Sequence, residues 1–241
     1  MTGFLKSVTA SLSAALWIAL TADAISTATP LSMIPHAAAQ QTPIPLAPKA
    51  GPDFIYNEAP DDHAIGSNLA PASLIIYASV TCPHCGSWFN NEWQTIKTEL
   101  VDTGDLRVVF REFPTAPGQI AMAEFIIANC AAKDTFFDQI EHQMAKQGDL
   151  IKSFETGETE QVLRDIAAHA GLTDENALNN CLQESAHIER ITRATERARA
   201  SGLKGVPGFF LNGEVYEGKQ DAKTMIDAIR DANAGGISTF K

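Results

Sequence analysis

The chain has 241 residues and a formal net charge of −11, from 18 Lys and Arg against 29 Asp and Glu. Its length suits one large domain or two small ones. The acidic balance argues against a protein that binds nucleic acid or anionic membrane surfaces, because both need basic patches.

The N-terminal segment predicts export. Lys6 precedes an apolar stretch around residues 12–20, and two small-residue patterns follow, ending at Ala24 and Ala39. We expect residues 1–39 to be a secretory signal peptide, cleaved after Ala39. An uncleaved anchor is the alternative, but the apolar stretch is short for a membrane span. Residues 40–60 contain five prolines and are expected to form a Pro-rich linker.

A strand followed directly by a helix carries the main motif. The continuous apolar run at Ser73–Ser79 predicts a buried central strand. The sequence Cys-Pro-His-Cys follows at Cys82–Cys85, and apolar residues then recur with helical spacing to about Leu100. Pro83 suits the first helical position, because the N–H that proline lacks is unpaired there anyway. Cys82 is therefore expected at the N-cap of the helix.

This placement favours thiol chemistry. The dipole and free N–H groups at a helix N-terminus stabilise an anion, and the anion available is the Cys82 thiolate. His84 can donate to the same sulfur. Cys85, one turn into the helix, can close a disulfide or resolve a mixed one. The pair could instead be half of a zinc site, but zinc usually takes four ligands and the sequence has no second C-x-x-C.

The rest of the chain changes its periodicity twice. A weak strand is expected near residues 61–66, and Leu106–Phe113 predicts a strand that completes a right-handed βαβ unit. Residues 117–202 show only helical spacing, typical of about five helices. Two short strands follow, joined by Asn212-Gly213, a pair typical of a type I′ hairpin turn. A final helix is expected over Asp221–Asn233.

These elements predict one interrupted domain. The strands and helices on either side of the helical stretch cannot bury both faces of a sheet unless they dock together. We therefore expect residues 61–116 and 203–241 to form one α/β domain, with residues 117–202 as a helical insert.

The residues resemble a known family. The strand, the Cys82–Cys85 helix start and the late Gly205-Val206-Pro207 resemble the thioredoxin superfamily. The helical insert in this place makes the DsbA-like periplasmic thiol-disulfide oxidoreductases the closest match, over roughly residues 60–241. The resemblance implies an α/β, thioredoxin-like fold with an inserted all-helical domain.

The resemblance also implies a role for each motif residue. Cys82 would be the attacking sulfur and Cys85 the resolving one, while His84 would stabilise the thiolate. Pro207 would be a cis-proline facing the disulfide, with the Val206 backbone pairing to an extended substrate segment. A trans proline at the start of an edge strand is the alternative for Pro207.

One departure from the family pattern concerns the proton of Cys85. Many relatives have a buried acid in the strand before the active site, which accepts a proton from the resolving thiol. Here that strand contains Leu74-Ile75-Ile76-Tyr77 and no acid. Glu112, at the end of the next predicted strand, is the nearby candidate.

Two further cysteines, Cys130 and Cys181, lie on apolar helix faces in the predicted insert. They could be free buried residues. In an exported chain with four cysteines, however, a structural disulfide between them is the expectation.

The resemblance implies an oxidase that donates the Cys82–Cys85 disulfide to reduced exported proteins in the periplasm, without a small-molecule cofactor. A DsbB-like, quinone-linked membrane oxidase would reoxidise it. We expect a monomer, because no dimerisation domain precedes the fold. An isomerase or reductase of the same fold is one alternative, although Val206 before the proline favours the oxidase. A periplasmic copper or zinc carrier using Cys82, Cys85 and His84 is another.

Overall fold

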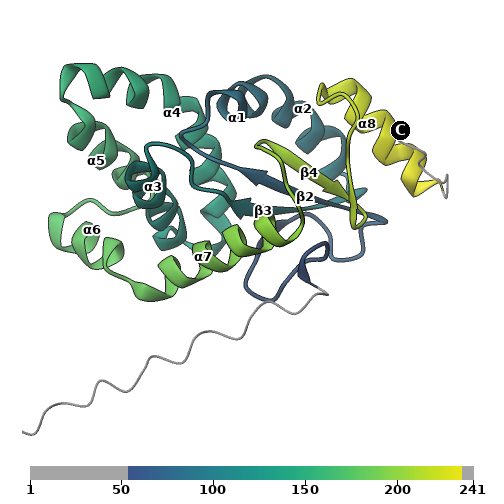
Figure 1. Cartoon of the computed structure of the whole chain (residues 1–241), viewed down its shortest axis with the longest axis horizontal. Coiled ribbons are helices and arrows are strands. Elements are labelled where there is room, and N and C mark those ends of the chain that lie inside the picture. Colours follow the sequence, from purple (N-terminus) through teal and green to yellow (C-terminus); the bar gives the residue numbers. More distant parts are fainter. Residues whose placement is uncertain (1–53, 235–241) are drawn as a thin grey trace, which may run out of the picture. The chain divides into compact units, whose positions relative to one another are not determined.

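The computed structural model describes residues 54–234. A five-stranded sheet with strand order β1-β3-β2-β4-β5 lies at its centre (Figure 1). Its strands are β1 (His63–Ile65), β2 (Ala72–Ala78), β3 (Leu106–Glu112), β4 (Gly208–Leu211) and β5 (Glu214–Val215). The β2–β3 pair is parallel, as a βαβ unit requires, and the other neighbouring pairs are antiparallel. The weak strand expected near residues 61–66 is present as β1, at the edge beside β3.

A continuous helical segment joins β2 to β3 and begins at the cysteine motif. It comprises α1 (Pro83–Trp88), the π-helical turn η2 (Phe89–Trp93), α2 (Gln94–Ile96) and a second π-helical turn η3 (Lys97–Val101). The apolar positions that predicted this helix are buried: Phe89, Trp93, Ile96 and Leu100. The π-helical turns were not expected. Because each turn of this kind is wider than an α-helical one, the buried face shifts and Val101 lies inward together with Leu100.

The chain between β3 and β4 is mainly helical. Its helices are α3 (Gly118–Cys130), η4 (Lys133–Thr135, a short 3-10 turn), α4 (Phe136–Thr156), α5 (Thr159–His169), α6 (Glu175–Leu182) and α7 (Ser185–Ala200). Asp174 is the N-cap of α6, and its side chain accepts a hydrogen bond from the Ala177 N–H. The five α-helices expected in this stretch are therefore present.

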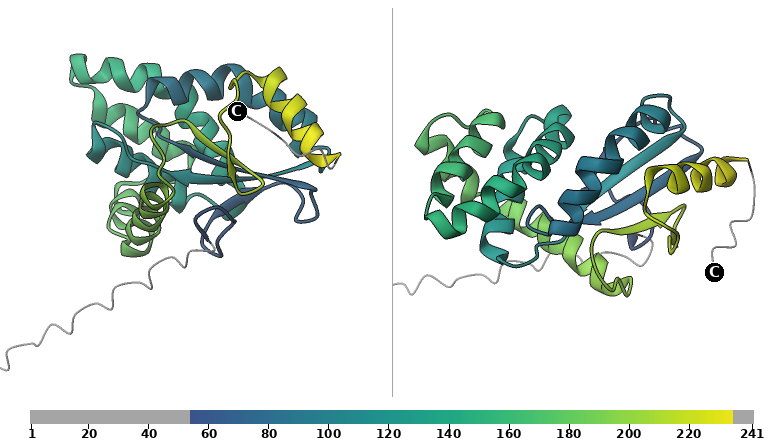
Figure 2. Two further views of the ribbon diagram at one scale, coloured as in Figure 1. Left: turned by 45° about the vertical axis from the view of Figure 1, so that its right-hand side comes forward. Right: turned by 90° about the horizontal axis from the view of Figure 1, so that it is seen from above.

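Helices cover both faces of the sheet (Figure 2). On one face, Leu74 and Ile76 belong to a core that includes the α1–η3 segment and α8 (Ala222–Asn233). On the other face, Ile75 and Tyr77 pack in a cluster with Ala198 of α7. Thus α7, which follows the other helices of this stretch, contributes directly to the core of the sheet. Its helical periodicity could not show this, because spacing identifies a buried face but not its partner.

Buried ion pairs connect α7 to the sheet. Arg111 of β3 is wholly buried, and its Nη2 lies 2.7 Å from the Asp62 carboxylate. Arg197 of α7 contacts the same carboxylate at 3.2 Å and that of Asp61 at 2.6 Å. Removing one partner of such a group would leave an unpaired charge in the interior, at a cost of roughly 3–5 kcal/mol. The network therefore fixes the position of α7 relative to β3.

The C-terminal elements follow the predicted pattern. Asn212 and Gly213, between β4 and β5, have φ values of 49° and 85°, as a type I′ turn requires. Asp221 caps α8 by accepting a hydrogen bond from the Thr224 N–H.

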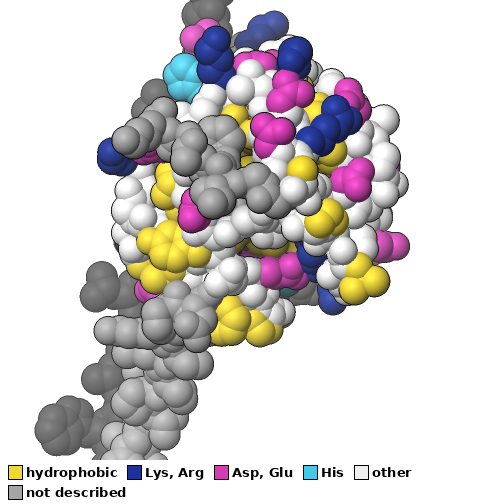
Figure 3. All heavy atoms as spheres, turned by 90° about the vertical axis from the view of Figure 1, so that its right-hand side faces the viewer, with side chains coloured by type: hydrophobic (Ala, Val, Ile, Leu, Met, Phe, Trp, Pro, Cys, Tyr) yellow, Lys and Arg dark blue, Asp and Glu magenta, His cyan; other side chains and the backbone are white. Residues whose placement is uncertain are grey.

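The face that contains α8 carries mixed charge. Basic and acidic side chains are interspersed on it (Figure 3), and the ion pairs Lys223–Asp227 and Arg230–Glu99 contribute to the mixture. Among residues 54–234, no helix has the length and apolar character needed to cross a membrane.

Candidate active site

The cysteine motif lies where β2 ends and α1 begins. The Cys82 N–H donates to the Ser79 carbonyl at 3.2 Å, which closes a turn after the strand. Cys82 is the N-cap of α1, with extended backbone angles (φ −86°, ψ 117°), and Pro83 starts the helix. Cys82 is half-buried, whereas Cys85 is buried. A second molecule can therefore reach only one sulfur of the pair directly.

Cys85 is held as a thiol. Burial raises its pKa, and hydrogen bonding to the Cys82 sulfur raises it further. The Ser79 N–H opposes this trend, because it donates to the Cys85 Sγ at 3.4 Å. The arrangement favours Cys82 as the attacking sulfur, and it means that Cys85 must lose a proton before it can attack.

The loop before β4 faces the motif. The Val206–Pro207 peptide bond is cis, and the Cys82 Sγ lies 3.6 Å from the Val206 carbonyl oxygen, as donor to acceptor. The structure thus brings together two predicted site segments that lie 124 residues apart in the chain.

A groove of about 620 Å³ lies beside the cysteine pair. Its lining is mainly polar and includes His84, Ser87, Asn91, Lys204, Pro207 and Gln220. Two hydrogen bonds fix its walls to each other. The Trp88 Nε1 donates to the Gln220 carbonyl at 2.7 Å, and the Ala222 N–H at the start of α8 donates to Glu92 at 2.7 Å. These two bonds join the helical segment after Cys82 to the start of α8, and exposed His84 lies among the lining residues.

Gln147 of α4 supports the motif from the helical segment, and the sequence analysis missed it. Its Nε2 donates to the carbonyls of Val80 and Cys82, at 2.7 and 2.9 Å. The same side chain packs against Gly86, where an added Cβ would approach its Oε1 to 2.3 Å. A glycine in the active-site helix hinted at a close approach, but a polar contact across 65 residues leaves no periodic pattern.

Glu112 is buried at the end of β3, but it belongs to a structural network. It forms an ion pair with Arg190 of α7 and accepts a hydrogen bond from the Asn129 Nδ2 at 3.0 Å. A carboxylate paired with a guanidinium is stabilised in its charged form. Glu112 is therefore poorly suited to take up the Cys85 proton.

The alternative function as a metal carrier would need a cluster of ligands, and the described part of the chain contains none. No group of three or more His, Cys, Asp and Glu side chains there is arranged to hold a metal ion. Two thiols and one histidine at a helix start supply fewer protein ligands than a closed zinc site.

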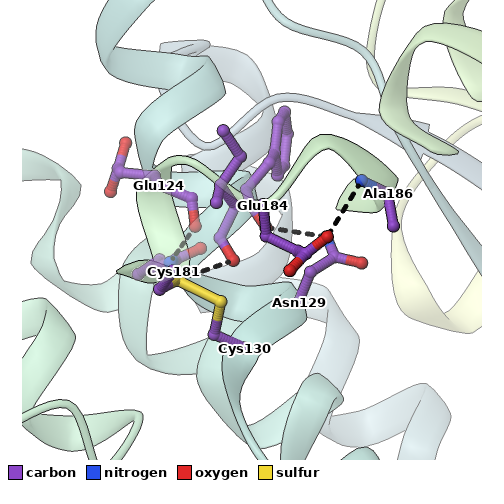
Figure 4. Close-up of a disulfide and its surroundings, with 9 residues drawn as sticks. Glu124, Asn129, Cys130, Cys181, Glu184 and Ala186 are labelled. Carbon is purple, nitrogen blue, oxygen red and sulfur yellow. Dashed lines mark hydrogen bonds between the residues drawn. A yellow bond between two sulfur atoms is a disulfide. The ribbon is translucent and has the colours of Figure 1, made fainter. Parts of the chain in front are cut away.

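Cys130 and Cys181 form a disulfide that joins α3 to α6 (Figure 4). The two residues are 51 positions apart. The Ile126 carbonyl lies 3.6 Å from the Cys181 sulfur, so the bridge packs against the α3 backbone. Its position in the helical segment is consistent with a bracing function.

Comparison with known proteins identifies relatives of this arrangement. Residues 58–231 match the family model described as thioredoxin. A Rickettsia typhi protein provisionally named protein-disulfide oxidoreductase is 27% identical over 154 residues, which cover 64% of this chain and 55% of the relative. A Rickettsia conorii protein with the same provisional name is 28% identical over 174 residues, 71% of this chain and 60% of that protein. The chain therefore spans little more than half the length of these relatives.

A solved structure shows the same fold. The crystal structure of alpha-DsbA1 from Wolbachia pipientis superposes with a TM-score of 0.66 at 22% sequence identity, covering 76% of this chain and 96% of that one. The α/β fold with helices between β3 and β4, expected from the sequence, is confirmed by this likeness and by the family match.

Proposed function

This chain belongs to the thioredoxin family, and we propose that it is a protein thiol-disulfide oxidoreductase of the DsbA type. One observation carries the proposal: a half-buried Cys82 at a helix N-cap faces the Val206 carbonyl, while its partner Cys85 is buried behind it. This asymmetry suits disulfide exchange, because one sulfur meets the substrate and the other resolves the mixed disulfide. The names of the Rickettsia relatives point to the same activity.

We further propose that the enzyme works as an oxidase, donating the Cys82–Cys85 disulfide to reduced exported proteins. An oxidant must be more stable in its reduced form than an ordinary dithiol. The position of Cys82 at a helix N-cap supports this, because a helix N-terminus is a favourable place for an anion.

The proposal includes location and partners. The Cys130–Cys181 disulfide suits an oxidising compartment, and the predicted signal peptide lies at residues 1–39, outside the described residues. The protein would act as a monomer in the periplasm without a bound cofactor. A DsbB-like, quinone-linked membrane oxidase would restore its disulfide.

The redox equilibrium with glutathione tests the direction of the reaction. Purified protein is equilibrated in glutathione buffers of graded ratio, and the fraction of oxidised Cys82–Cys85 is measured by alkylation and mass spectrometry. A reduction potential of about −120 mV for the Cys82–Cys85 pair would support an oxidase, whereas one of about −270 mV would identify a reductase. Intermediate values near about −180 mV, together with refolding of scrambled substrates, would favour an isomerase.

A further inference from the structure

The turn between β2 and α1 determines where the Cys82 side chain points. On one side, the Cys82 N–H is bonded to the Ser79 carbonyl. On the other, the Cys82 carbonyl accepts the first hydrogen bond of the helix, from the Gly86 N–H at 3.0 Å. These partners belong to the segments that enter and leave the turn. A third partner, the Gln147 side chain, comes from a distant part of the chain.

Gln147 joins α4 to this turn. The residue is only 6% exposed, and its Nε2 donates to the Val80 carbonyl at 2.7 Å and to the Cys82 carbonyl at 2.9 Å. An amide nitrogen carries two hydrogens, so one side chain can make both bonds. The two carbonyls belong to the residues on either side of Thr81. The bonds therefore fix the path of the backbone where it reaches Cys82.

The active-site helix leaves space for this amide. An added Cβ at Gly86 would lie 2.6 Å from the Gln147 Cδ and 2.9 Å from its Nε2. A larger residue at this position would therefore push the amide away from the two carbonyls. One turn further along, the Asn90 Nδ2 donates to the Met144 carbonyl of α4 at 3.1 Å. The two helical segments thus meet through polar contacts at successive turns.

We propose that Gln147 is a positioning residue for disulfide exchange. The inference deepens the proposed function and rests on it. In the exchange step a substrate thiolate bonds to the Cys82 sulfur, the Cys82–Cys85 bond breaks, and its electron pair remains on Cys85. The attacking sulfur must approach close to the line of the breaking bond, so the rate depends on the direction of the Cys82 sulfur. Gln147 holds the backbone that sets this direction, and it keeps the sulfur beside the Val206 carbonyl.

Replacing the amide tests this role. Gln147→Met removes both donors and keeps the length of the side chain. Gln143→Met is the matched control, because Gln143 is wholly buried one turn earlier on α4 and donates its Nε2 to the Glu124 carbonyl at 2.7 Å, on α3 instead of the cysteine motif. Oxidised protein is mixed with dithiothreitol, quenched with acid and alkylated, so that the appearance of free thiols is timed. We expect Gln147→Met to slow the reaction at least about tenfold, since a displacement of about 1 Å can cost about a hundredfold. Gln143→Met should remain close to the wild type.

Gly86→Ala provides a second test that leaves Gln147 in the chain. The added Cβ displaces the amide from the carbonyls, while alanine favours a helix more than glycine does. We expect a similar slowing, and little further slowing when Gly86→Ala is added to Gln147→Met. If Gln147→Met does not fold, as judged by its circular dichroism spectrum, the single Gly86→Ala variant is compared with Gln143→Met.

A third variant separates hydrogen bonding from packing. The carboxyl introduced by Gln147→Glu can donate a hydrogen to a carbonyl while it is protonated, but not once it is ionised. Its exchange rate, relative to the wild type at the same pH, should therefore recover as the pH is lowered. Gln147→Met cannot donate at any pH, so its relative rate should show no such recovery.

Several outcomes would overturn the positioning role. These are an unchanged rate in folded Gln147→Met, an equal slowing in Gln143→Met, full additivity of Gly86→Ala with Gln147→Met, or a relative rate of Gln147→Glu that does not recover at acidic pH. A wild-type protein that does not exchange disulfides with dithiothreitol would instead refute the proposed function.

Discussion

Replacing Glu124 by Gln should stabilise the fold, and by more as the pH rises. Glu124 lies on α3 with no exposed surface, and neither of its carboxylate oxygens has a hydrogen-bond partner. Burial raises the pKa of this carboxyl from 4.5 to about 8. An ionised carboxylate without a partner is costly in the interior, so the folded protein keeps Glu124 protonated near neutral pH.

The sign and size of the effect follow from the two pKa values. Because the folded pKa is raised, the native state binds more protons than the unfolded chain between pH 4.5 and about 8. Stability is therefore full below about pH 4.5 and falls as the pH rises through about 8. At 1.36 kcal/mol per pH unit, the free energy of unfolding lost across this pH interval is at most about 5 kcal/mol. Glutamine has no charge to lose, so the variant avoids this penalty.

Urea unfolding of Glu124→Gln and wild type, near pH 4.5 and near pH 8.5, measures the difference. The exposed Glu155→Gln on α4 is the matched control, and it should show little change at either pH. A stability gain in Glu124→Gln that is the same at both pH values would refute the reasoning. It would show that the Glu124 carboxyl ionises in the folded protein as it does in the unfolded chain.

Three predictions concern the cysteines. Replacing Cys130 and Cys181 by Ala should lower the free energy of unfolding by about 4 kcal/mol, from the 51-residue separation, yet leave dithiol oxidation intact; loss of activity in the folded variant would show a redox role. In the reduced protein, iodoacetamide should label Cys82 much faster than buried Cys85, and equal rates by peptide mapping would contradict the predicted roles. Paired denaturation curves at pH 7 should show the reduced form to be more stable than the oxidised one, as a strong disulfide oxidant requires; the opposite order would exclude the oxidase.

The sequence predicted the parts of the fold that leave a local pattern. The apolar run of β2, the helical spacing after Pro83 and the Asn212-Gly213 turn each identified an element within a few residues of its place. The cysteine motif was placed at the helix start for a local reason too, because proline favours the first helical position. The match to the thioredoxin family then confirmed the fold that these elements implied.

Polar contacts between distant segments could not be predicted in this way. Gln147 reaches the carbonyls around Cys82 from a helix that begins more than fifty residues later, and Thr115 meets Ser79 across 36 positions. The wholly buried Arg111 looks from sequence like a solvent-exposed charge, since arginine is seldom buried unless paired. Such contacts depend on how elements dock, which neither hydrophobic periodicity nor propensity records.

The pairing of β2 with β4 has a consequence for the order in which the active site is completed. Cys82 lies in the first half of the chain, but the strand and loop that face it, from Val206 to Leu211, come after α3–α7. A chain that folds as it emerges from its N-terminus exposes the Cys82 sulfur long before this facing loop arrives. The two segments can meet only when almost the whole domain is present. Loop closure over so many residues is slow, so the incomplete chain carries an exposed cysteine for a time.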